Sequence, residues 1–79
     1  MRHKVWYGFP SHYSAAETVS EWTLWHRDYM RSPDGYQPDT DDTFPNFLEA
    51  DMFARWRSDE HSGRIIFRAF PHDVDPNYL

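Results

Sequence analysis

Cysteine is absent from the 79-residue sequence, which excludes disulfide bonds and zinc sites built on thiolates. Long apolar runs are missing as well, because no stretch approaches the roughly 20 residues that a membrane-spanning helix needs. Residues 1–4 are basic, but the apolar run behind them ends at Pro10 and is too short for the apolar part of a signal peptide. We therefore expect a cytoplasmic protein that has no membrane partner.

Recognised catalytic motifs are also missing. The sequence has no glycine-rich nucleotide loop, no G-x-S-x-G nucleophile elbow and no HExxH pair. Residues 39–42 resemble the start of a calcium-binding loop, but no glycine follows at the required position and the twelfth position is Ala50 instead of glutamate. A chain this short scarcely forms a cleft that could tune paired carboxylates. We therefore expect no enzymatic activity, no cofactor and no metal site.

Basic residues are scarce relative to acidic ones. Eight Lys and Arg against 13 Asp and Glu give a formal net charge of −5, which argues against a nucleic-acid binder that acts through bulk charge. Aromatic residues are instead abundant, at 19% of the chain. Large rings are what a small domain without disulfides needs to build a core. Rings in excess of that core would form an exposed patch, and such patches usually mark binding surfaces.

Two segments have the alternation typical of strands. In residues 3–9, Val5, Tyr7 and Phe9 fall on one face, and Trp6 on the other face indicates a strand that is covered on both sides. In residues 64–70, the inward positions are Ile65, Phe67 and Ala69, and prolines end both segments.

Two further segments have helical spacing. Residues 14–31 start with a capping-box pattern, Ser14 to Glu17, and continue with an apolar stripe that includes Trp22 and Trp25. Residues 44–58 follow Asp42 and Thr43, either of which can cap a helix. For this second helix we predict a buried stripe, and we expect Phe53 off its centre and Glu49, Arg57 and Asp59 in solvent. The stripe consists of Phe44, Phe47, Leu48, Met52 and Trp56.

The predicted fold is therefore α+β, in the order β-α-α-β, with two helices packed on a small antiparallel sheet. Residues 1–79 form a single small domain with an acidic loop around 32–43 and an extended tail at 71–79. Two strands make a thin sheet, so a third strand would come from the loop, from the tail or from a second copy in a dimer.

The negative charge is concentrated in one part of the chain, since residues 32–54 hold six carboxylates and no basic side chain. In an extended segment, Asp39 and Asp41 would point the same way about 7 Å apart. This spacing is close to that of successive phosphates along a nucleic-acid strand, so such a surface could enter a basic groove. The alternative is a solvated loop followed by an ordinary helix face. The candidate partner-binding residues are Asp34, Tyr36, Asp39, Asp41, Asp42, Glu49 and Asp51.

From these features we expect a non-enzymatic inhibitor or adaptor that presents the acidic surface to the basic site of another protein. The nucleic-acid channel of a host enzyme is such a site. In its profile (short, cysteine-free, acidic, aromatic-rich and without catalytic motifs), the chain is similar to small phage-encoded inhibitors of host enzymes, including anti-CRISPR proteins and DNA mimics.

Two alternatives stay open. One is a small nucleic-acid-binding module in which Arg64 and Arg68 are interleaved with aromatic rings on a strand, as in RNA-binding sheets. The segment lacks the full RNP1 pattern, and Phe67 and Phe70 fall on opposite faces, so we do not expect direct nucleic-acid binding. The other is a structural subunit that forms a homodimer through its excess aromatic residues.

Overall fold

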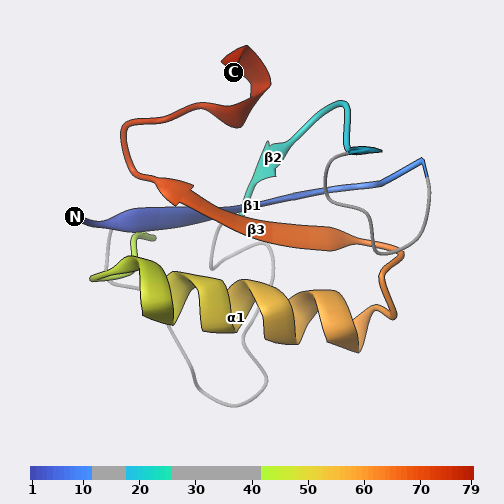
Figure 1. The fold of residues 1–79 in the computed structure, drawn as a ribbon, viewed down its shortest axis with the longest axis horizontal. Coiled ribbons are helices and arrows are strands. Elements are labelled where there is room, and N and C mark those ends of the chain that lie inside the picture. Colours follow the sequence, from blue (N-terminus) through green and yellow to red (C-terminus); the bar gives the residue numbers. More distant parts are fainter. Residues whose placement is uncertain (12–17, 26–41) are drawn as a thin grey trace.

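The computed structural model describes residues 1–11, 18–25 and 42–79, and these form a three-stranded antiparallel sheet with one α-helix against it (Figure 1). The chain order is β1 (His3–Gly8), β2 (Thr23–Leu24), α1 (Phe47–Glu60), β3 (Ile66–Pro71) and a 3₁₀ turn at Pro76–Tyr78. In the sheet the order is β2-β1-β3, so β1 is the central strand. Figure 1 shows α1 on one side of the β1–β3 pair and residues 72–79 on the other side. This arrangement fits the predicted α+β class, whereas the predicted β-α-α-β order with two helices is not confirmed.

The two predicted strands are present, with small shifts at their ends. β1 and β3 pair antiparallel, with Val5 opposite Ala69 and Tyr7 opposite Phe67, all on the face toward α1. β1 ends at Gly8, so Phe9 lies beyond the strand and is 68% exposed instead of buried. β3, the strand predicted over residues 64–70, begins at Ile66, two residues later than expected.

The helix predicted over residues 14–31 is wrong where the structure describes it. Residue 18 is 3₁₀-helical, and from there the chain pairs with the β1 region: Val19 forms an isolated bridge with Pro10, Thr23 pairs with Tyr7 and Leu24 with Trp6. Trp22 and Trp25 are three residues apart, which fits one face of a helix but opposite faces of a strand. The ring of Trp25 is fully buried on the α1 side, whereas Trp22 contacts Phe70 on the other side. The rest of that predicted helix lies outside the described residues.

The second predicted helix exists, but its boundaries and its buried face differ from the prediction. α1 begins at Phe47, and its N-cap is Asn46, whose side chain accepts a hydrogen bond from the N–H of Glu49 at 3.0 Å. The residues turned toward the sheet are Ala50, Phe53, Ala54 and Arg57. Two alanines allow a close approach to the sheet, and Phe53 fills the space between helix and strands.

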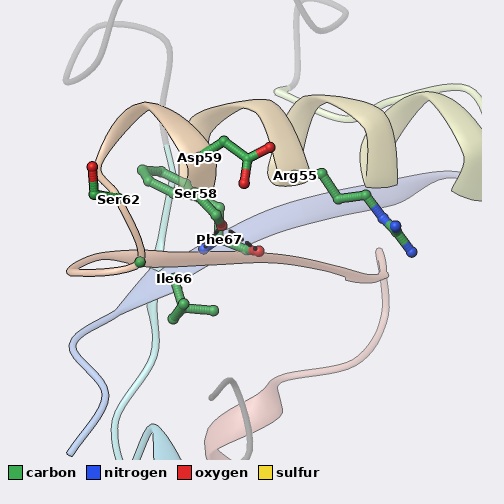
Figure 2. Close-up of a pocket in the computed structure, with 7 residues that line it drawn as sticks. Arg55, Ser58, Asp59, Ser62, Ile66 and Phe67 are labelled. Carbon is green, nitrogen blue, oxygen red and sulfur yellow. Dashed lines mark hydrogen bonds between the residues drawn. The ribbon is translucent and has the colours of Figure 1, made fainter. Parts of the chain in front are cut away.

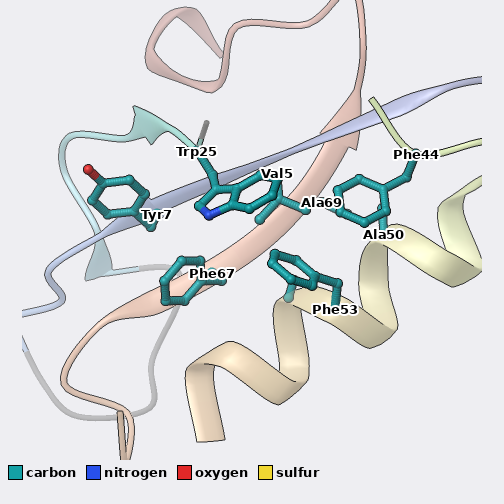
Figure 3. Close-up of a cluster of buried hydrophobic side chains, with 9 residues drawn as sticks. Val5, Tyr7, Trp25, Phe44, Ala50, Phe53, Phe67 and Ala69 are labelled. Carbon is teal, nitrogen blue, oxygen red and sulfur yellow. The ribbon is translucent and has the colours of Figure 1, made fainter. Parts of the chain in front are cut away.

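The core is aromatic and lies between α1 and the sheet (Figure 3). The ring of Phe53 is 4.9 Å from that of Trp25 and 5.2 Å from that of Phe44, measured between centroids. Phe44 precedes the helix and is fixed by two backbone hydrogen bonds with His3, of 2.9 and 2.7 Å. The cluster consists of Val5, Tyr7, Trp25, Phe44, Ala50, Phe53, Ala54, Phe67 and Ala69.

The opposite face of the sheet is covered as well, as the position of Trp6 predicted. The rings of Trp22 and Phe70 meet edge to face at 5.4 Å, and Pro76 is buried. The segment predicted as an extended tail is more structured than expected, because β3 continues to Pro71 and the chain then turns into the 3₁₀ turn. The third strand of the described sheet comes from residues 23–24, which belong to the helix predicted over residues 14–31.

Gly8 marks a close approach between β1 and the segment that leads into β2. A Cβ atom added there would collide with a methyl group of Val19 and would lie 2.6 Å from the carbonyl oxygen of Glu21. The Val19 side chain can move aside, but the backbone carbonyl can move only if the segment shifts. We therefore expect Gly8→Ala to lower the free energy of unfolding by about 1–3 kcal/mol, as measured by urea denaturation. An unchanged denaturation midpoint would contradict this close approach.

Candidate protein-binding face

The structure describes three of the seven predicted site residues, and it does not gather them into one patch. Asp34, Tyr36, Asp39 and Asp41 lie outside the described residues. Asp42 precedes α1 and is half-buried with a positive φ of 62°. Glu49 and Asp51 are two residues apart on α1, so their side chains leave the helix about 200° apart. The carboxylate of Asp51 is held at 2.9 Å from Nε of Arg55.

The sequence prediction placed three large apolar side chains of α1 in the core, whereas the structure exposes them. Phe47 is 53% exposed, Leu48 65% and Met52 58%. Leu48 and Met52 are four residues apart and lie one above the other on the side of α1 that faces away from the sheet. We call Phe47, Leu48 and Met52 the apolar patch of α1. Its centre is Leu48 and Met52, and Phe47 lies about 100° round the helix from Leu48, on the flank where its ring meets that of His3 at 5.5 Å. These three residues belong to the apolar stripe that the sequence shows, but periodicity alone does not indicate which side of the helix is buried.

Charged groups border the apolar patch. Asp51 lies next to Met52 and is paired with Arg55, whose side chain is 79% exposed. Glu49 lies on the opposite flank of the helix, and Asp42 precedes the first turn. From residue 42 to residue 54 the sequence holds three acidic side chains and no basic one. An apolar centre with a charged border is the usual anatomy of a protein–protein interface.

A hollow of about 510 Å³ lies between the C-terminal half of α1 and the start of β3 (Figure 2). The Ser58 hydroxyl, which lines it, accepts a hydrogen bond from the N–H of Phe67 at 2.8 Å and donates to the carbonyl of Phe67 at 3.3 Å. Ser58 is therefore already engaged with the backbone of Phe67. The lining residues are Arg55, Ser58, Asp59, Ser62, Gly63, Ile66 and Phe67.

Arg57, predicted in solvent, is buried at the C-terminal end of α1. Its guanidinium donates to Glu60 at 2.8 Å and lies 5.6 Å from the ring centroids of both Trp56 and Phe67. The ring of His61 stacks on Phe67 at 5.8 Å, and its Nε2 is 4.0 Å from the same Glu60 carboxylate. This cluster connects the end of the helix to β3.

The basic strand proposed as an alternative nucleic-acid site does not present a row of rings. Phe67 belongs to the core on the α1 side, while Phe70 lies on the other face, as predicted. The guanidinium of Arg68 lies 5.5 Å from the ring of Phe70, whose ring also meets Trp22. Phe70 therefore has aromatic and cationic neighbours of its own within the fold.

Arg57 should stabilise the fold through its aliphatic chain more than through its charge, because Glu60 is partly exposed. We expect Arg57→Ala to lower the free energy of unfolding by about 2–3 kcal/mol, since the rings of Trp56 and Phe67 lose a packing neighbour. Arg57→Met, which keeps the unbranched chain, should cost less than half as much. Equal losses for both variants in chemical denaturation would show that the ion pair, and not the packing, is what matters.

The described residues contain no group of three or more His, Asp or Glu side chains placed to hold a metal ion. In the same ranges, no helix has the length and apolar character that a membrane crossing requires. Comparisons of the chain with protein-family models, with curated proteins and with solved structures found no match.

Proposed function

We propose that this chain is a non-enzymatic protein-binding domain, an inhibitor or adaptor that docks the outer face of α1 on a basic surface of another protein. The observation that carries the proposal is the apolar patch of α1, in which Phe47, Leu48 and Met52 are each more than half exposed. Three such side chains within six positions of one helix are unfavourable in water unless a partner covers them.

The packing of α1 on the sheet suits the helix to this role. Ala50, Phe53 and Ala54 hold α1 against β1 and β3, so the helix is already formed before a partner arrives. Binding then requires little ordering of the backbone, which lowers the entropic cost of association. A helix that presents apolar side chains on its outer face is typically received in an apolar groove, with anchors one turn apart such as Leu48 and Met52.

The acidic residues indicate the charge of the surface that the partner presents. Asp51 and Glu49 on the flanks of α1, together with the acidic residues that precede the helix, favour a groove bordered by Lys and Arg. Enzymes that handle nucleic acids have such grooves, because their channels bind phosphates. We infer an action in the cytoplasm, by steric and electrostatic competition for such a site, as in small phage-encoded inhibitors.

The first test is removal of the apolar patch. Because Met52 is 58% exposed, Met52→Asp should fold normally but place a charge at the centre of the interface. We expect it to reduce capture of the partner from host lysate at least tenfold at equal bait concentration. Phe9→Asp is the matched control, since Phe9 is 68% exposed but lies outside α1. Equal capture by both variants and the original chain would contradict docking through α1.

The second test concerns charge. Replacing Asp39, Asp41, Asp42 and Asp51 together by asparagine should weaken partner binding at low salt and flatten its dependence on salt concentration. The measurement is the dissociation constant of the purified complex at several ionic strengths. An unchanged affinity at low salt would remove the electrostatic part of the proposal while leaving the apolar part intact.

A further inference from the structure

Among residues 1–11, 18–25 and 42–79, the sheet has two outer edges, one at β2 and one at β3. Backbone N–H and C=O groups on an edge can template the addition of a strand from another chain. In antiparallel pairing, alternate residues turn these groups away from the neighbouring strand. The N–H of Trp25 donates to the carbonyl of Val5 at 2.9 Å, so the backbone groups of Trp25 face β1. By alternation, the backbone N–H and C=O groups of Leu24 and Trp22 face away from β1. By the same alternation, Phe67 and Ala69 turn outward on β3.

On each edge, one side chain forms hydrogen bonds with both the outward-facing N–H and the outward-facing C=O of a single residue. On the β2 edge, Oδ1 of Asn77 accepts from the N–H of Trp22 at 2.7 Å, and its Nδ2 donates to the carbonyl of Trp22 at 2.9 Å. On the β3 edge, the hydroxyl of Ser58 makes the equivalent pair of hydrogen bonds with Phe67. Each side chain thereby takes the place that an added strand would occupy.

The two side chains differ in how firmly they are held. Ser58 belongs to α1, which packs on the core through four buried residues. Asn77 belongs to residues 72–79, where Pro76 is the buried position and Tyr78 and Leu79 are each 86% exposed. His72, at the start of this segment, is held by its N–H, which donates to the carbonyl of Arg2 at 3.0 Å. Further along, the hydrogen bonds of Asn77 with Trp22 and the burial of Pro76 fix the segment to the sheet. The β2 edge is therefore the one that can open.

We propose that Asn77 blocks strand pairing at the β2 edge. When its hydrogen bonds with Trp22 break, the edge can pair with the same edge of a second copy of this chain. Residues 22–25 contain no charge and no proline, so nothing in this stretch opposes strand pairing. Antiparallel pairing of two identical edges is symmetric, because Trp22 and Leu24 of each copy supply both donors and acceptors. The result is one continuous sheet across two copies.

The test compares Asn77→Ala with the unaltered chain by sedimentation velocity over a range of concentrations. Tyr78→Ala is the control, since it alters the adjacent, exposed position and leaves both hydrogen bonds to Trp22 in place. We expect Asn77→Ala to dimerise at concentrations at least tenfold lower than either reference. Hydrogen exchange of the Trp22 amide should become about tenfold faster in dilute, monomeric Asn77→Ala. Sedimentation of Asn77→Ala identical to that of both references would overturn the proposal.

A second variant identifies the surface that is used. Thr23 is exposed on β2, so Thr23→Lys combined with Asn77→Ala places like charges on the two edges that would meet. We expect this double variant to return to the sedimentation behaviour of the unaltered chain. Persistence of the dimer would show that another surface associates and would overturn the proposal. If Asn77→Ala fails to fold, Asn77→Leu, which keeps a side chain of similar size but can neither accept from nor donate to Trp22, replaces it in both experiments.

Discussion

The contact of Phe53 with Trp25 and Phe44 decides most of this structure. Its ring lies 4.9 Å from the ring of Trp25, which follows β2, and 5.2 Å from that of Phe44, which precedes α1 and is tied to β1 through His3. The contact fixes which side of α1 faces the sheet. The apolar patch of α1 is exposed as a direct consequence, because a helix held inward by Phe53 must turn Leu48 and Met52 outward.

The sequence predicts those parts of the fold whose periodicity has one interpretation. The strands around Val5 and Phe67 alternate cleanly and are ended by prolines, and both are confirmed within two residues. Trp22 and Trp25 have a spacing that fits one face of a helix and equally the two faces of a strand, and the structure adopts the strand. For α1, apolar residues occur on both sides, so its inner face is chosen by shape: Ala50 and Ala54 allow close approach to the sheet, and Phe53 fits between the other two rings.

The charged residues of the candidate site can be found from the sequence, but its apolar residues cannot. Charge could be counted along the chain, so Asp42, Glu49 and Asp51 were identified with no knowledge of the fold, although they do not form one patch. The exposure of Phe47, Leu48 and Met52 cannot be inferred from the sequence, because it depends on the rotation of α1 about its own axis. In a small domain with several large rings, the sequence does not specify which rings the core will accept.

A sheet of three strands, two of them at edges, has a large share of backbone that needs partners from outside the sheet. Here side chains provide part of what further strands would provide, through Ser58 on one edge and Asn77 on the other. This arrangement bears on recognition as well as on stability. With both edges occupied at Phe67 and Trp22, the sheet offers few unpaired backbone groups to another chain at these positions, while α1 still presents apolar side chains within two helical turns. Under the proposed function, a partner would therefore meet side chains, which distinguish one protein surface from another, and not backbone edges, which any extended chain could pair with.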